Sequence, residues 1–194
     1  ILLAVWVFRK IAVHNQKTLA SPAGGGLRDA LLLGFYVIFH PFNGYWALKG
    51  EKRGGVRSAT ILLALACLTQ AIAAAASGFL SGDEEASVGS GVLNLLAPLL
   101  LWCIANTCFT SLMDGKGSFR DVYVAVGTST LPVTLLVLPC TVVSHFLILE
   151  ELPILAMVTN VAYIWMAALI FFSMITVHDY TLGKNVLVSI LTVL

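Results

Sequence analysis

The segment DGKGSFRDVYVAVGTSTLP, residues 114 to 132, is a short charged turn that runs directly into an apolar stretch. Uncharged runs of 28 residues lie on either side of this turn, at 86–113 and 122–149. A helix that crosses a hydrocarbon core of about 30 Å needs roughly 20 apolar residues. The segment therefore predicts the polar hinge between two membrane-spanning helices.

Uncharged windows of similar length recur elsewhere in the chain. Residues 58–82 and 152–178 form two more, and another apolar window follows Lys184. The chain is 59% hydrophobic and 11% charged, with a mean hydropathy of +0.94, which is too apolar for a protein surface in water. We therefore predict an all-α, polytopic membrane helical bundle of five transmembrane helices, with four spans near 58–80, 92–113, 122–147 and 152–177 and a fifth beyond Lys184.

The basic residues indicate how the bundle is oriented. All eleven Lys and Arg residues fall in segments 1–57, 114–121 and 178–185, whereas the intervening loops carry only Asp83, Glu84, Glu85, Glu150 and Glu151. Loops rich in Lys and Arg stay on the cytoplasmic side of a membrane. We therefore expect an integral membrane protein with its basic loops in the cytoplasm, and no nucleic-acid partner.

The residues before the first span divide into three parts. Residues 1–10 are expected to end a preceding membrane helix, as an anchor rather than a signal sequence. Residues 11–26 have the Pro, Gly and Ser content of a cytoplasmic linker. Residues 27–55 are expected to form interfacial amphipathic helices, and 56–194 the five-span domain.

Residues 27–55 contain apolar side chains at helical spacing, but the apolar run is too short to cross a bilayer. A second helix is expected to start at Pro41, because proline suits a first helical turn. Phe42, Tyr45 and Trp46 are expected at headgroup level, and the basic cluster from Lys49 to Arg57 should face anionic lipid headgroups. The alternative is that this stripe packs on the bundle.

Two asparagines and several prolines are the unusual residues inside the spans. Asn106 and Asn160 are expected either to make interhelical hydrogen bonds or to line a small substrate path. Pro132 frees a backbone carbonyl, and we expect the hydroxyls of residues 128–130 to satisfy it. Pro98 and Pro139 are expected to bend their helices in the same way.

Sequence patterns of catalysis are missing from the spans. Away from their ends they contain no Asp, Glu, Lys or Arg, and the chain has no HExxH, GxSxG or phosphate-binding loop motif. The four cysteines fall inside the spans without a CxxC pair, as packing residues do. We therefore expect no enzyme, no cofactor and no metal site.

The expected cytoplasmic ends of the spans carry a cluster of charged and polar residues. Such groups on adjacent short turns can form a salt-bridged cap or a docking surface for a partner. Neighbouring His178 and Asp179 lack a third ligand for a metal. The predicted partner-binding residues are Asp114, Lys116, Arg120, Asp121, His178 and Asp179, with Lys184 beside them.

Three stretches of the chain resemble the Yip family, the five-span Ypt-interacting membrane proteins, over roughly residues 41–194. Gly127-Thr128-Ser129-Thr130-Leu131-Pro132-Val133 is similar to the family's Gly-Tyr-x-x-x-Pro-Val/Ile signature, with Thr in place of Tyr. LMDGKGSFRDVY at 112–123 and HDYTLGK at 178–184 resemble bacterial members. The family's Asp-Leu-Tyr-Gly-Pro motif has no counterpart here.

The resemblance implies a non-enzymatic protein of the bacterial cytoplasmic membrane that organises partner proteins, as a scaffold or accessory subunit. The alternative is a small permease or transporter component, in which the prolines and the two asparagines would shape a path. A transporter predicts a cavity that reaches Asn106 or Asn160, whereas a scaffold predicts tight packing there.

Overall fold

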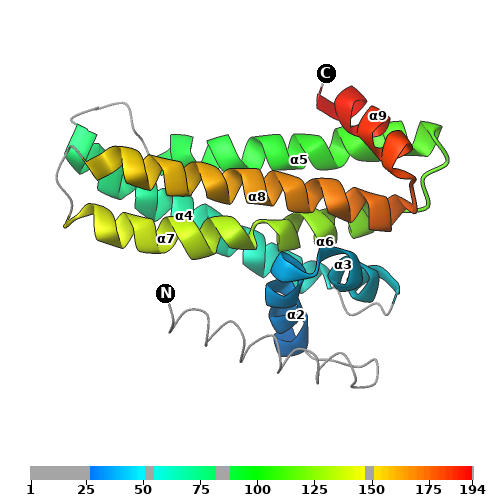
Figure 1. Cartoon of the computed structure of the whole chain (residues 1–194), viewed down its shortest axis with the longest axis horizontal. Coiled ribbons are helices and arrows are strands. Elements are labelled where there is room, and N and C mark those ends of the chain that lie inside the picture. The colour runs from blue at the N-terminus through cyan, green and yellow to red at the C-terminus, as the bar shows by residue number, and fades with distance from the viewer. Residues whose placement is uncertain (1–26, 51–54, 82–87, 147–150, 194) are drawn as a thin grey trace.

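The computed structural model describes residues 27–50, 55–81, 88–146 and 151–193 of the 194-residue chain. The elements in this part of the chain are helices (Figure 1), which confirms the all-α prediction. The membrane-helix end expected at 1–10 and the linker expected at 11–26 lie outside the described residues. So do Lys52 and Arg53 of the predicted basic cluster.

Four helical segments are long and apolar enough to cross a membrane. They are α4 (Val56–Ser81), α5 (Val88–Leu112), α8 (Leu152–His178) and the pair formed by α6 (Phe119–Ser129) and α7 (Leu131–Ser144). These segments lie side by side along the long axis of the molecule (Figure 1). Four of the expected spans therefore correspond to helical segments of sufficient length and hydropathy.

The expected fifth span corresponds to α9 (Leu182–Val193), which has 12 residues. Twelve helical residues extend about 18 Å, less than the thickness of a hydrocarbon core. The helix is apolar and packs against α5. A fifth crossing therefore stays a prediction.

The α6–α7 pair is the centre of the bundle. In its most apolar window 61% of the residues are buried, compared with 17–28% in the windows of the other three candidate spans. The helix is interrupted at Thr130, because Pro132 has no N–H to continue the ladder. The Thr130 N–H points instead to the carbonyls of Gly127 and Thr128.

The hydroxyls near this break do not act as we predicted. Those of Thr128, Ser129 and Thr130 donate to the preceding carbonyls of Val124, Ala125 and Gly127, at 2.8 Å each. A helical side chain leans toward the previous turn, so its hydroxyl reaches the carbonyl three or four residues back. The carbonyl that Pro132 frees, four residues back, is that of Thr128, and it faces the Thr130 N–H while none of the three hydroxyls donates to it.

Small residues bring α4 and α6 close together. A Cβ added at Gly127 would lie 2.9 Å from the carbonyl oxygen of Ala59, and Ala59 is fully buried. Close backbone approach between small residues is a common way for helices to associate in lipid. The glycine that begins the family-like signature therefore has a packing role.

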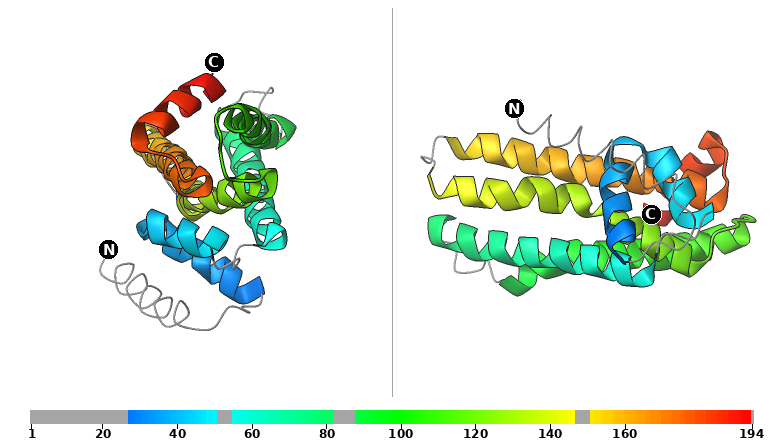
Figure 2. Two further views of the ribbon diagram at one scale, coloured as in Figure 1. Left: turned by 90° about the vertical axis from the view of Figure 1, so that its right-hand side faces the viewer. Right: turned by 90° about the horizontal axis from the view of Figure 1, so that it is seen from below.

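Two shorter helices, α2 (Leu27–Phe39) and α3 (Pro41–Gly50), precede the first span. The start of α3 at Pro41 is confirmed. In Figures 1 and 2, α2 runs across the long axis of the bundle, and both helices lie on the side opposite α9. α2 packs on α4, α6 and α7, and α3 packs on α8, so this stripe does pack on the bundle.

The position expected for Tyr45 is wrong. Phe42 and Trp46 are 51% and 60% exposed, as an interfacial position requires, but Tyr45 is only 1% exposed. Its hydroxyl lies 2.6 Å from Ser129 Oγ on α6. A tyrosine can be buried when its hydroxyl has a partner, and the sequence does not show that partner.

Candidate functional site

The turn between α5 and α6 is held by a capping box. Ser118 Oγ accepts the backbone N–H of Asp121, and Asp121 Oδ2 accepts the backbone N–H of Ser118 at 3.0 Å. The Ser118 hydroxyl also donates to Oδ2, at 2.7 Å. These bonds satisfy amide groups that a helix start leaves free. Asp121 therefore positions the turn that carries Lys116.

Two glycines let this turn lie directly on the end of α8. A Cβ at Gly115 would stand 2.7 Å from Tyr180 Oη and 2.8 Å from His178 Nδ1. A Cβ at Gly117 would stand 2.9 Å from the carbonyl oxygen of Val177. Any larger residue would push the two turns apart.

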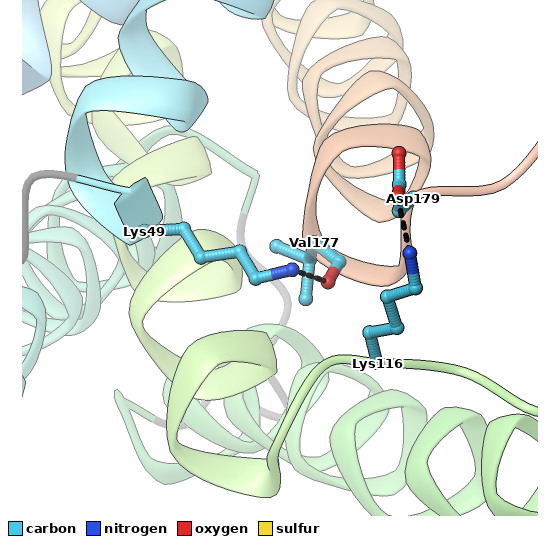
Figure 3. A network of polar contacts seen from close by, with 4 residues as sticks. All are labelled: Lys49, Lys116, Val177 and Asp179. Carbon is cyan, nitrogen blue, oxygen red and sulfur yellow. Dashed lines mark hydrogen bonds and ion pairs between the residues drawn. The ribbon is translucent and has the colours of Figure 1, made fainter.

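An exposed ion pair joins the two turns. Lys116 Nζ lies 2.7 Å from Asp179 Oδ2 (Figure 3), and the side chains are 71% and 68% exposed. Asp179 has φ 57° and caps α8 in the left-handed conformation, with its N–H on the Ile175 carbonyl. The hydrogen bond and charge of Lys116 lower the pKa of Asp179, and Asp179 raises the pKa of Lys116. Both groups therefore stay charged at neutral pH.

A buried polar group lies beneath this pair. His178 is 1% exposed and Asn106 is fully buried, and His178 Nε2 lies 3.2 Å from Asn106 Oδ1. This hydrogen bond links α8 to α5. The Tyr180 ring stacks on the His178 ring with centroids 5.3 Å apart. The Tyr180 hydroxyl donates to the Met113 carbonyl at 3.3 Å.

Tyr180 also connects the group to α9. Lys184 Nζ lies 4.7 Å from the centroid of the Tyr180 ring, within the range of a cation–π contact. Burial raises the pKa of the Tyr180 phenol, and the carboxylate of Asp114 raises it further. Tyr180 therefore keeps its proton at neutral pH and acts as a hydrogen-bond donor.

The third part of the site comes from α3. Lys49 Nζ donates to the Val177 carbonyl at 2.6 Å (Figure 3), one turn along α3 from the buried Tyr45. The backbone carbonyls at the end of a helix have no partner within it, and lysine can satisfy them. Sequence analysis missed this contact, although the i, i+4 spacing of Tyr45 and Lys49 placed them on one helix face.

A cavity of about 300 Å³ lies between these elements. Three helices that are far apart in the sequence form its walls: α3, α6 and α8. The lining residues are Tyr45, Leu48, Lys49, Arg120, Asp121, Val124, Ala125 and Val177.

The structure brings the predicted partner-binding residues to one end of the bundle, but they have different structural roles there. Lys116 and Asp179 form the surface pair. Asp121 caps α6, and Arg120 lines the cavity. His178 is buried. Asp114 lies in the turn with φ 54°.

The predicted intramembrane residues are not brought together. Asn106 bonds to His178, Pro132 lies in the first turn of α7, and Asn160 is exposed on α8 without a side-chain hydrogen bond to the described residues. Within the described ranges, no group of three His, Cys, Asp or Glu residues is placed to hold a metal ion.

Comparison with known proteins agrees with this architecture. The family model of the Yip1 domain matches residues 35–194, which is most of the chain. No curated protein and no solved structure matches the chain. The matched range includes α3, all four candidate spans and both turns of the site. The chain therefore belongs to the Yip1 domain family, and its apolar helices make it a membrane protein.

Proposed function

We propose that this protein is a non-enzymatic scaffold or accessory protein of the bacterial cytoplasmic membrane that organises partner proteins. The docking surface is the exposed Lys116–Asp179 pair together with Asp114, on the end of the bundle that faces the cytoplasm. The observation that carries the proposal is the construction of this pair. Two glycines, a left-handed cap and a capping box hold a strongly exposed ion pair in one place.

An exposed ion pair contributes little to stability, because water screens it and its side chains lose freedom. The glycines, the left-handed cap and the capping box that position the pair are therefore better explained by binding of a partner than by stability of the fold. His178 belongs to that support, since it is buried and cannot touch a partner. The placement of all basic residues on one side of the predicted spans supports a cytoplasmic position.

The permease alternative lacks comparable support. It predicts a cavity that reaches Asn106 or Asn160, yet Asn106 is fully buried against His178 and Asn160 is exposed on α8. The cavity lined by Arg120 does not include either residue.

Affinity purification from mild detergent tests the scaffold proposal. We compare the wild type with Lys116→Glu, Asp179→Lys and the double charge swap, and we use Arg57→Glu as a control on the exposed start of α4. A partner that copurifies with the wild type and the control, but with none of the three pair variants, supports the proposal. A protein set that is the same for all five forms contradicts it.

A further inference from the structure

We propose that the cavity between α3, α6 and α8 binds the phosphodiester group of an anionic phospholipid. This binding site is separate from the exposed ion pair, so it does not depend on the protein partner proposed above. It also differs from a general attraction of basic residues to the membrane, because it is one cavity with named lining residues.

The charges of the cavity match one phosphodiester. Its lining contains two cations, Lys49 and Arg120, and one carboxylate, Asp121, which leaves an excess of one positive charge. A phosphodiester carries a single negative charge, so its binding would neutralise that excess. Asp121 already accepts two hydrogen bonds from Ser118 and caps α6, so these bonds hold its carboxylate in the capping box.

The cations of the cavity have hydrogen-bond donors to spare. The Lys49 ammonium donates one N–H to the Val177 carbonyl, and its other two N–H groups remain available to a ligand. The side chain of Arg120 makes no hydrogen bond or ion pair with the rest of the described chain. A guanidinium can bind two phosphate oxygens at once, and such charge-assisted bonds are stronger than neutral ones.

The other walls of the cavity favour a lipid over a free ion. Leu48, Val124, Ala125 and Val177 supply apolar surface next to the cations. A volume of about 300 Å³ is at the small end of ligand sites, so it accommodates a headgroup while the acyl chains stay outside. Phe42 and Trp46, exposed on α3, offer the aromatic surface that is typical of the headgroup region.

Native mass spectrometry of the detergent-purified full chain tests this site. Phosphatidylglycerol and phosphatidylcholine are added at equal concentration, and the lipid that remains bound is counted. The wild type is expected to retain phosphatidylglycerol in preference to phosphatidylcholine. Arg120→Gln should weaken that retention about tenfold, since a hydrogen bond to a charged group contributes about 1.5 kcal/mol or more.

Arg57→Gln is the matched control, because it makes the same change of side chain at an exposed arginine that does not line the cavity. It should retain phosphatidylglycerol as the wild type does. Equal losses in both variants, or no loss in Arg120→Gln, would overturn the proposal. Displacement of the lipid by an equal concentration of glycerol phosphate or inorganic phosphate would also overturn it, since the site would then take a soluble phosphate. Protection of the wild type against heat by phosphatidylglycerol, absent in Arg120→Lys, is a second readout that supports a forked guanidinium contact.

Discussion

The hydrogen bond between Tyr45 and Ser129 joins α3 to the central helix, and its polarity can be worked out. The Ser129 hydroxyl donates to the Ala125 carbonyl at 2.8 Å, so its only proton is used. The Tyr45 hydroxyl must therefore be the donor of the 2.6 Å bond to Ser129 Oγ. Burial raises the pKa of Tyr45, so that proton is present at every working pH.

This polarity predicts an asymmetry between two substitutions. Ser129→Ala leaves the buried Tyr45 O–H without an acceptor, which should cost about 1–3 kcal/mol of unfolding free energy. Tyr45→Phe removes the donor and leaves Ser129 with its bond to Ala125, so it should cost only about 0.5–1.5 kcal/mol. The double variant should cost less than the sum of the two, by about 1 kcal/mol.

Equilibrium unfolding in mixed micelles, followed by circular dichroism, measures these free energies. Tyr123→Phe is the matched control, because the Tyr123 hydroxyl makes a 3.1 Å bond to Thr60 that is exposed. That control should change the unfolding free energy little. A larger cost for Tyr45→Phe than for Ser129→Ala, or strict additivity in the double variant, would refute the assigned donor and the buried bond.

Three further substitutions test the packing and the site. Gly127→Ala should lower the unfolding free energy by about 1–3 kcal/mol through overpacking. Gly183→Ala, at a position with open space around it, should be neutral or stabilising. Equal effects of the two substitutions in the same micelle titration would contradict the close approach of α4 and α6. Asp179→Asn should leave the melting temperature unchanged at neutral pH, because asparagine tolerates the left-handed conformation and the ion pair is exposed. In the wild type, the small stabilisation by the pair is present above the normal pKa of an aspartate and is lost as the pH falls through the lowered pKa of Asp179. A difference in melting temperature between wild type and variant that changes between pH 6 and 8 would contradict this prediction. Asn106→Leu should destabilise by about 1–3 kcal/mol by leaving His178 Nε2 unpaired, and adding His178→Leu should recover part of that loss; an additive loss would show that the two side chains do not interact.

The span boundaries were accessible to sequence analysis because charges are costly in lipid. The expected starts at 58, 92 and 152 lie within four residues of those of α4, α5 and α8. The family signature from Gly127 to Pro132 was also found. Its break at Thr130 follows from the proline, but the helix beyond it continues to Ser144.

The candidate site was only partly predictable. The charged residues at 114–121 and 178–184 were identified as one cluster, because both segments separate apolar windows. Lys49 was assigned to a different basic cluster. The partners of Lys49 and Tyr45 are 128 and 84 residues away in sequence, and no local pattern encodes contacts that distant. The expectation for Tyr45 failed for that reason.

The assignment as a membrane protein follows from the sequence alone, and so does the prediction that the basic residues share one side, since the transfer of charge and apolar surface between water and lipid depends on local composition. The division of one polar cluster into an exposed pair, a buried histidine and a cationic cavity was decided only by the tertiary structure. Burial and hydrogen-bond partners depend on which helices lie side by side. Packing of α3 against α8 and α6 forms the cavity that Arg120 lines, whereas Lys116, four residues earlier and in the loop before α6, lies in the exposed pair.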